Sequence, residues 1–376
     1  MISAGEASGD HHAAALVEHL SAASPGLSFF GLGGPGMAKA GVELRADAGQ
    51  VSVTGLFEVL PALGRILKAL RAMKKALAEE RPRALILVDF PDFNFLLARA
   101  ARKRKVPVIY YIVPQIWGWR RGRVKFLKKN VSRLVVILPF EEDWYRERGL
   151  KTFYAGHPLA DLPPLDSDHR ARFLTELGID PDRPVVGLLP GSRSNEIKRT
   201  MPLLAQAARL LLEERPDLSF LLPLAPGRNR EEIQDRLNGL PAVLVQGRAR
   251  EVLAASRAAL VCSGTATLEA ALARTPLVMF YRVSPLTYLL RGLVPMVDTF
   301  SLPNLIGGRK VVSELIQGQA SPERLAAEAL TLLDEGERRE EMLAFLDQVR
   351  ARVGGPGAAG RAAGAILKTL AQAGAR

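Results

Sequence analysis

Short apolar runs alternate with longer segments of helical periodicity along the whole chain. In the first half, these runs predict strands at residues 28–32, 84–89, 106–113, 133–138 and 152–155. In the second half, they predict strands at residues 185–189, 219–223, 242–245, 259–262 and 277–280. Helical segments fit between them, including residues 63–80, 95–103, 201–214 and 267–273. The alternation is typical of parallel sheets with helices on both faces, so we expect an α/β fold.

The length of the chain predicts two domains, because 376 residues exceed what one ordinary core holds. Residues 158–168 are rich in Pro and Asp and lack periodicity, so we place the boundary there. We expect Rossmann-like, doubly wound lobes at residues 1–162 and 163–353, facing a cleft between them. A second break at residues 354–357 precedes a separate terminal helix within residues 358–376.

The formal net charge of +12 indicates an anionic partner or surface. Arg is spread widely, and only residues 117–123 combine aromatic and basic side chains as a nucleic-acid surface would, so we favour a membrane surface or a phosphorylated substrate and expect no nucleic acid. No apolar run reaches transmembrane length, which predicts a soluble or peripheral protein. The single Cys262 excludes a disulfide framework, and five scattered His give no metal-ligand spacing.

Residues 190–193 end a predicted strand in the sequence Pro-Gly-Ser-Arg. Gly191 and Ser192 offer backbone donors to an anion, and Arg193 can bind a phosphate with two parallel hydrogen bonds. An ordinary β–α turn has no use for Arg193. This loop therefore predicts a phosphate site.

A second loop of this kind contains Ser263, Gly264, Thr265 and Ala266, followed by Thr267. Its hydroxyls and the amides of the helix start can hold a diphosphate.

Glu269 lies within the first turn of that helix, where an acid also favours the helix dipole; the functional interpretation is a bond to ribose hydroxyls. Asn304, beyond the last predicted strand, either reaches the ligand or caps a turn.

The first half places a carboxylate at the end of a strongly apolar strand. Pro91 stops this strand, and Asp92 is suited to cap the next helix, but capping does not explain Asp89. A carboxylate at the end of a buried strand must be paired or functional. Asp89 is therefore our candidate general base.

The opening loop contains Gly5, Glu6, Ser8, Gly9 and Asp10, before a helical segment at residues 11–20. It is either a turn in which Ser8 or Asp10 caps the helix, or a cleft loop that faces a sugar or phosphate.

Residues 31–36 match the dinucleotide pattern G-x-G-x-x-G. We interpret them as a tight turn, because too little chain follows for a helix and a second strand before Glu43.

Residues 51–77 combine apolar and basic side chains at helical spacing. Such a pattern is usually a core helix with a solvated basic face. Here the apolar set is dense and interrupted by Pro61, which favours a segment that dips into a membrane interface. The predicted contact consists of Leu56, Phe57, Val59, Leu60 and Leu63.

Taken together, the motifs resemble the lipid-A-disaccharide synthase family over essentially the whole chain. They are Ser3-Ala4-Gly5-Glu6-Ala7-Ser8-Gly9-Asp10, Asp89-Phe90-Pro91-Asp92-Phe93-Asn94, Pro114-Gln115-Ile116-Trp117-Gly118-Trp119-Arg120, Gly156-His157-Pro158, Leu189-Pro190-Gly191-Ser192-Arg193, Ser263-Gly264-Thr265 and Ser301-Leu302-Pro303-Asn304. Family members usually carry a few residues before the first glycine loop. We therefore expect a short first strand or a late start in this chain.

The resemblance implies a B-type glycosyltransferase fold, whose C-terminal helix commonly returns to the first lobe. It implies transfer of a 2,3-diacylglucosamine unit from UDP to the 6-hydroxyl of 2,3-diacylglucosamine 1-phosphate. It further implies acylated glucosamine substrates, an enzyme without metal or other cofactor, and work on an anionic membrane, peripherally at the cytoplasmic face of the inner membrane. An oligomer is left open.

Within this picture, Asp89 would accept the proton of the acceptor hydroxyl, while Trp117, Trp119 and Arg120 would line the acceptor site. Two alternatives remain. One is another UDP-N-acetylglucosamine-using transferase or 2-epimerase of the same fold, and the other is a non-catalytic basic module that binds membranes or RNA.

Overall fold

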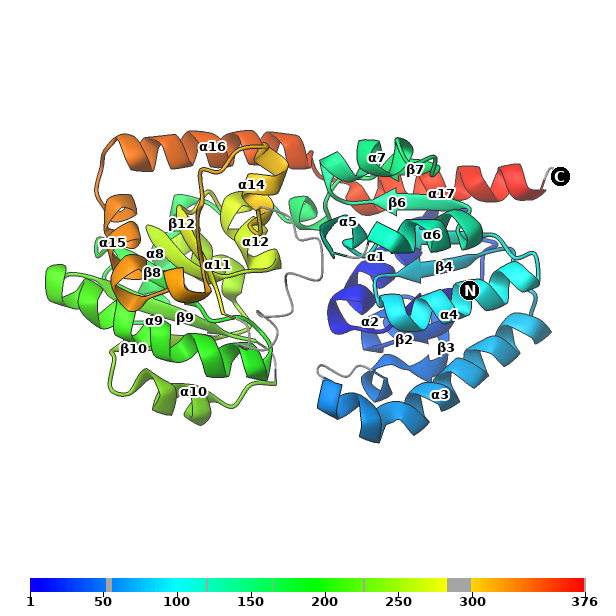
Figure 1. The fold of residues 1–376 in the computed structure, drawn as a ribbon, viewed down its shortest axis with the longest axis horizontal. Coiled ribbons are helices and arrows are strands. Elements are labelled where there is room, and N and C mark those ends of the chain that lie inside the picture. The colour runs from blue at the N-terminus through cyan, green and yellow to red at the C-terminus, as the bar shows by residue number, and fades with distance from the viewer. Residues whose placement is uncertain (52–55, 120, 164, 226, 283–298, 375–376) are drawn as a thin grey trace. The chain divides into compact units, whose positions relative to one another are not determined.

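The computed structural model describes residues 1–51, 56–119, 121–163, 165–225, 227–282 and 299–374 (Figure 1). The chain divides into two compact units. Unit 1 consists of Met1–Asp161 and Gly354–Arg376, and unit 2 consists of Leu162–Val353. Each contains one parallel sheet flanked by helices, so the expected α/β class with two doubly wound lobes is confirmed.

Unit 1 is built on a seven-stranded parallel sheet, called sheet A, with the order β3-β2-β1-β4-β5-β6-β7. Its strands are β1 (Ile2–Ala4), β2 (Phe29–Gly33), β3 (Val42–Asp47), β4 (Leu85–Val88), β5 (Val108–Tyr111), β6 (Arg133–Val136) and β7 (Thr152–Tyr154). Its helices are α1 (Ala7–Ala23), α2 (Pro35–Lys39), η1 (Ala48–Gln50), α3 (Leu56–Glu79), α4 (Pro91–Lys103), α5 (Ile116–Trp119), η2 (Arg121–Arg123), α6 (Val124–Asn130), α7 (Pro139–Arg146), η3 (Pro158–Asp161) and α17 (Ala358–Gly374).

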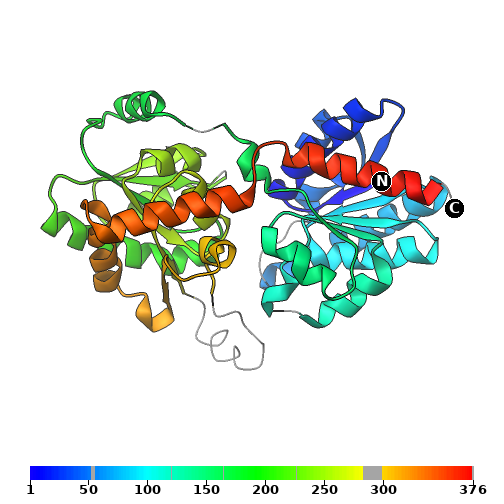
Figure 2. The same ribbon diagram turned by 90° about the horizontal axis from the view of Figure 1, so that it is seen from above.

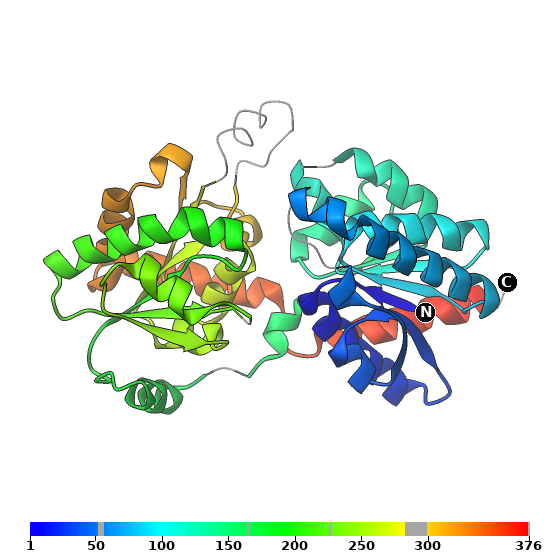
Figure 3. The same cartoon turned by 90° about the horizontal axis from the view of Figure 1, so that it is seen from below.

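The last helix belongs to the first unit. α17 packs beside α1 on one face of sheet A (Figure 2), and its residues Ala362 and Ile366 are fully buried in the same core as Ile2, Val88 and Tyr111. On the opposite face, α3 packs against α4 (Figure 3). Helices on both faces explain why the strands read as continuous apolar runs rather than alternating patterns.

Unit 2 is built on a six-stranded parallel sheet, called sheet B, with the order β10-β9-β8-β11-β12-β13. Its strands are β8 (Val185–Leu189), β9 (Ser219–Leu224), β10 (Ala242–Gln246), β11 (Ala258–Cys262), β12 (Leu277–Tyr281) and β13 (Ser313–Ile316). Its helices are α8 (Ser167–Glu176), α9 (Ser194–Glu214), α10 (Arg230–Leu237), α11 (Ala249–Ala255), α12 (Thr265–Leu272), α14 (Leu302–Gly307), η5 (Gln317–Gln319), α15 (Pro322–Leu333) and α16 (Glu337–Val353).

The helices that flank sheet B also pack against one another. α9 packs against α10 and α15, α11 packs against α8, and α12 packs against α14 and α16. Phe173 and Leu174 of α8 join Val185, Leu221 and Val252 in one buried cluster. Among the described residues, no helix has both the length and the apolar character needed to cross a bilayer.

Candidate active site

The centre of sheet A is a topological switch point. β1 and β4 are neighbours, but the chain continues from them toward opposite edges of the sheet, which opens a crevice at their carboxyl ends. Ala4 pairs with Val88, so Gly5 and Asp89 leave the sheet from adjacent strands. A Cβ atom on Gly5 would lie 2.1 Å from the ring of Phe90, so only glycine fits beneath that ring. The opening loop and the Asp89 loop therefore form one surface.

Asp89 has a strained backbone. Its φ is 44° and that of Phe90 is 49°, in the left-handed region that non-glycine residues seldom occupy. Two side chains hold the Asp89 carbonyl oxygen in this conformation, because Asn94 Nδ2 donates to it at 2.8 Å and the Tyr110 hydroxyl donates at 2.7 Å. Asp89 as a residue is partly buried. The two donors fix the backbone from which the carboxylate projects, which suits a positioned base.

Asn94 and Tyr110 are the residues near Asp89 that sequence reasoning did not assign. Both are fully buried, and Asn94 Oδ1 also accepts from the Ser3 hydroxyl at 2.7 Å. Burial, followed by the charge of Asp89, raises the pKa of Tyr110 well above its ordinary value, so this hydroxyl stays a donor at neutral pH. The position of Asn94 shortly after the acid was the available signal, but sequence spacing does not reveal which carbonyl an amide will reach.

Asp10 serves the structure of unit 1. Its carboxylate accepts backbone N–H groups from Gly34 at 2.7 Å, Gly36 at 2.8 Å and Met37 at 3.1 Å. A Cβ atom on Gly34 or Gly36 would lie within 2.9 Å of this carboxylate. The glycines therefore let their amides surround a carboxylate of the same chain. The expectation that Ser8 or Asp10 caps the first helix is wrong, because α1 begins at Ala7 with Glu6 as its N-cap and both residues lie inside the helix.

The interpretation of residues 31–36 as a turn also needs correction. Gly33 ends β2, the short helix α2 follows, and β3 begins at Val42, so a helix and a second strand do fit here. In the opening loop, Ser8 is exposed and Glu6 is partly exposed. These two side chains remain our candidates for ligand contact.

Trp117 is buried and donates a hydrogen bond to a carboxylate of unit 1. Its indole Nε1 donates to Glu141 Oε1 at 2.9 Å, and Glu141 Oε2 accepts from the Leu138 backbone at 3.1 Å. Trp117 is 5% exposed, so its polar edge is turned to the interior rather than to a ligand. The side chains of Trp119 and Arg120, proposed with it for the acceptor site, lie outside the described part of the structure.

The buried Glu141 predicts a pH effect on stability. Burial raises its pKa to about 7 against the lowering effect of Trp117. Between about pH 4.5 and pH 7 the folded carboxyl keeps a proton that the unfolded chain loses, so rising pH lowers stability in this window. We expect the unfolding free energy of the wild type, relative to Glu141→Gln, to fall by up to about 3 kcal/mol across it. Urea unfolding at a series of pH values, with exposed Glu147→Gln as control, measures this; parallel curves for wild type and Glu141→Gln would contradict it.

Sheet B has its own switch point between β8 and β11. The two loops that follow these strands are residues 190–193 and residues 263–264, the two predicted phosphate loops. Gly191 adopts a φ of 102°, where a side chain would be strained, and a Cβ atom there would lie 3.4 Å from Cys262 Sγ. Both loops therefore meet at the carboxyl edge of unit 2, where ligands of such sheets bind.

Arg193 stands at the N-terminus of α9 as its N-cap residue. Its guanidinium ion-pairs with Glu196 at 3.0 Å, and its side chain remains 59% exposed. Glu196 Oε2 also accepts the backbone N–H of Arg193 at 3.3 Å. A cation held at an anion-attracting helix start, yet largely in solvent, can bind an incoming phosphate.

α12 begins at Thr265 with Gly264 as its N-cap, and this glycine has no side chain that could cap the first turn. Gly264 has a φ of 143°, at which any side chain would be strained. Gly264 and Thr265 are exposed, and Ser263 and Ala266 are partly exposed. The Thr267 N–H bonds to the Gly264 carbonyl at 3.1 Å, while the exposed Gly264 and Thr265 leave the helix start within reach of a phosphate.

Glu269 lies one turn inside α12, and burial raises its pKa. In the part of the chain that the structure describes, its carboxylate makes no ion pair or hydrogen bond. Glu269 is partly exposed, so its carboxylate can accept hydrogen bonds from a ligand that reaches the start of α12.

Asn304 has a different role from the ligand contact suggested for it. It is 2% exposed, and its Oδ1 accepts the N–H groups of Val311 at 3.0 Å and Val312 at 2.9 Å. Its Nδ2 donates to the Val312 carbonyl and to Glu314, both at 2.8 Å. The alternative expectation, that Asn304 fixes a turn, is the one that these bonds support.

Of the predicted membrane contact, the structure describes only one side chain. The side chains of Leu56, Phe57, Val59 and Leu60 lie outside the described part, although their backbone belongs to α3. Leu63 is 45% exposed.

Known proteins are similar to this chain over nearly its whole length. Residues 1–354 match the family model described as lipid-A-disaccharide synthetase. A lipid-A-disaccharide synthase of Myxococcus xanthus is 50% identical over 372 residues, covering 98% of this chain and 97% of the relative. One of Syntrophus aciditrophicus is 44% identical over 366 residues, covering 96% and 95%.

Solved structures share the fold at low sequence identity. The calicheamicin glycosyltransferase CalG4 has a TM-score of 0.59 at 17% identity, covering 99% of this chain and 97% of that one. The UDP-GlcNAc 2-epimerase of Neisseria meningitidis has a TM-score of 0.63 at 13% identity, covering 99% and 98%. The fold is that of B-type glycosyltransferases, and, by its match over residues 1–354 and its identity to these relatives, the chain belongs to the lipid-A-disaccharide synthetase family.

Proposed function

We propose that this enzyme transfers 2,3-diacylglucosamine from its UDP derivative to the 6-hydroxyl of 2,3-diacylglucosamine 1-phosphate. The products are UDP and the β-1,6-linked lipid A disaccharide 1-phosphate. The observation that carries the proposal is the position of the predicted loops. In each unit they follow the two strands of the switch point, where ligands of open parallel sheets bind. That one substrate pair contacts both units remains part of the proposal.

Asp89 acts as the general base in this reaction. Its carboxylate takes the proton of the acceptor hydroxyl while that oxygen attacks the anomeric carbon of the donor and UDP departs from the opposite side. The left-handed backbone, held by Asn94 and Tyr110, supports this role because a base must be fixed before the hydroxyl arrives. Glu6 and Ser8, beside it, supply polar contacts to the acceptor sugar.

The departing UDP gains negative charge that unit 2 must stabilise. Arg193 and the uncapped amides of α12 supply positive potential for the diphosphate, which supports a transfer without a metal ion. The Glu269 carboxylate accepts hydrogen bonds that the ribose hydroxyls of UDP donate.

Glu269→Ala is expected to raise the KM for the UDP-sugar about tenfold with little change in kcat, because it removes a contact made equally in the ground and transition states. Steady-state kinetics with varied donor measures this, and exposed Glu213→Ala of α9 serves as the control. An unchanged KM would exclude Glu269 from the donor site.

A product assay tests the reaction itself. The enzyme is incubated with UDP-2,3-diacylglucosamine and 2,3-diacylglucosamine 1-phosphate, with and without EDTA, and the lipid product is identified by mass spectrometry. We expect the disaccharide 1-phosphate in both samples. Turnover of non-acylated UDP-N-acetylglucosamine instead would favour the transferase or 2-epimerase alternative.

The acylated substrates supply the reason for membrane contact, since each buried methylene contributes about 0.8 kcal/mol to retention in the bilayer. We propose that α3 approaches the anionic inner face of the inner membrane. Exposed Leu63 and Leu67 lie on this helix among the exposed cations Arg65, Lys68 and Arg71.

Replacing Phe57, Val59, Leu60 and Leu63 with Ser is expected to weaken co-sedimentation with anionic vesicles about tenfold or more, because apolar contact is lost. Leu96→Ser, which removes another exposed leucine from unit 1, is the matched control. Undiminished binding of the fourfold variant would place the contact elsewhere.

A further inference from the structure

A row of cations lines a pocket of about 1010 Å³ at the amino edge of sheet A, the edge opposite Asp89. Four neighbouring strands, β4 to β7, each have a basic residue of this pocket at their first residue or in the three residues before it, and these residues are Arg83, Lys105, Arg133 and Lys151. Since adjacent strands lie about 4.8 Å apart, the row extends over roughly 15 Å.

These four cations lack counter-charges. In the part of the chain that the structure describes, none of them makes an ion pair, and no Asp or Glu lines the pocket. A fifth lining cation, Arg146, is paired with Glu142 at 2.9 Å. Compensation of helix dipoles explains cations in the last turn of a helix, but the four lie outside the helices. Water and salt screen these mostly exposed charges in part, and a bound anion would neutralise them further.

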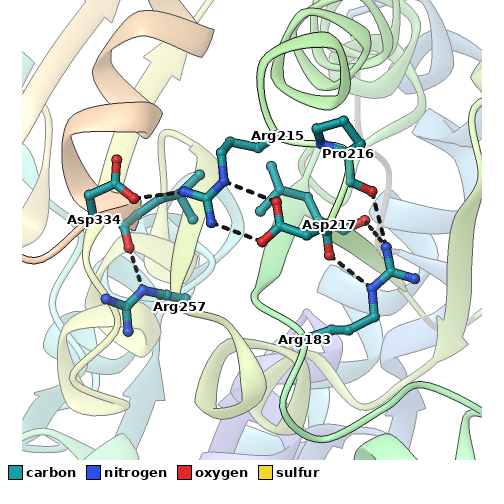
Figure 4. Close-up of polar contacts among 8 residues, drawn as sticks. Arg183, Arg215, Pro216, Asp217, Arg257 and Asp334 are labelled. Carbon is teal, nitrogen blue, oxygen red and sulfur yellow. Dashed lines mark hydrogen bonds and ion pairs between the residues drawn. The ribbon is translucent and has the colours of Figure 1, made fainter.

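The amino edge of sheet B shows what a self-neutralised pocket looks like (Figure 4). There, in a pocket of about 680 Å³, Arg215 binds both carboxylate oxygens of Asp217 at 2.9 Å and Asp334 at 2.6 Å. Arg183 donates to the carbonyl oxygens of Asp217 at 2.8 Å and Pro216 at 3.2 Å. Within the described residues, the chain supplies carboxylate partners for Arg215 in unit 2 but not for Arg83, Lys105, Arg133 and Lys151 in unit 1.

We propose that the pocket at the amino edge of sheet A binds an extended phosphate-bearing anion. Phosphate oxygens accept charge-assisted hydrogen bonds from guanidinium and ammonium groups. A row of four such groups suits a ligand with several phosphate charges rather than one. Leu150 and Leu370 also line the pocket, so a free polyphosphate and a phospholipid headgroup are both chemically suited. No aromatic side chain lines it to stack bases, which disfavours nucleic acid. The site lies apart from the sugar transfer and does not depend on it.

Lysine footprinting of the full-length protein tests this site directly. Acetylation rates of Lys105 and Lys151 are followed by mass spectrometry while sodium tripolyphosphate is added, with exposed Lys39 and Lys310 as internal controls. We expect saturable protection of roughly tenfold at Lys105 and Lys151 and none at the controls. Equal rates with and without tripolyphosphate, or equal slowing at all four lysines, would overturn the proposal unless vesicles protect as described next.

The second arm replaces tripolyphosphate with phosphatidylglycerol vesicles, against phosphatidylcholine vesicles. Protection of Lys105 and Lys151 by phosphatidylglycerol alone identifies a lipid headgroup, and protection by tripolyphosphate alone identifies a soluble anion. Arg133→Gln removes a charge-assisted hydrogen bond to the anion but keeps both reporter lysines. It is expected to weaken the protection of Lys105 and Lys151 about tenfold. Arg102→Gln, outside the pocket, is expected to leave this protection unchanged. No protection by either ligand, or equal protection in wild type and Arg133→Gln, excludes the site.

Discussion

Replacing Asp89 with Asn is expected to lower kcat by about 10²–10⁴-fold, the usual contribution of a positioned general base. Asparagine keeps the size of the side chain, and the carbonyl that binds Asn94 and Tyr110 belongs to the backbone, so the strained loop keeps its supports. The KM for the donor should change little, because Asp89 acts on the acceptor. Steady-state kinetics at saturating donor and acceptor, with unfolding curves of both proteins, separates lost chemistry from lost structure.

Asp92→Asn is the matched control. Asp92 stands three residues along the same loop and helix, is exposed, and ion-pairs with Arg123 at 2.5 Å, so its loss should cost at most about 1 kcal/mol of stability and little activity. The structure corrects its expected role, since the N-cap of α4 is Phe90. If Asp89→Asn retained wild-type kcat, or if both variants lost activity equally, Asp89 would not be the base.

Asp10→Ala is expected to lower the unfolding free energy by about 4 kcal/mol, because it leaves buried backbone donors without an acceptor. The N–H groups of Gly34, Gly36 and Met37 all point at this carboxylate, and the loop places them too close for water to replace it fully. Urea unfolding, followed by circular dichroism and by a spectroscopic probe in each unit, measures the lost unfolding free energy.

The same variant distinguishes the two interpretations of the opening loop. A structural anchor loses stability in Asp10→Ala and Asp10→Asn alike, since the amide of asparagine turns a donor toward one of the three N–H groups. Exposed Glu18→Ala on the same helix should change stability by less than about 0.5 kcal/mol. Unchanged stability with lost turnover in Asp10→Ala would instead make Asp10 a ligand contact.

Periodicity was sufficient to predict the α/β class, because strands buried on both faces are short apolar runs that local sequence reveals. It was not sufficient for β3 and β13. Val42–Asp47 carries Glu, Arg and Asp at the edge of sheet A, and Ser313–Ile316 is a four-residue edge strand, so neither has the apolar content of a central strand. Edge strands are defined by their neighbours rather than by their own residues.

The candidate site divides in the same way. Asp89 and the loops at residues 190–193 and 263–267 were predicted because they follow apolar strands, and the topology brings them to the switch points. The bonds of Asp10 and Trp117 were not predictable, since their partners Gly34 and Glu141 are 24 residues away in each case. Such pairings depend on tertiary packing, which sequence spacing does not encode.

The return of α17 to α1 has a consequence for how the protein is made. Unit 2 is continuous in sequence, so a ribosome synthesises all of it before the residues that complete unit 1. The core around Ile2 stays without Ala362 and Ile366 until α17 has been translated. The N-terminal half of the polypeptide is therefore the last to finish folding, and a nascent chain stalled at Val353 should expose the apolar face of α1 to chaperones.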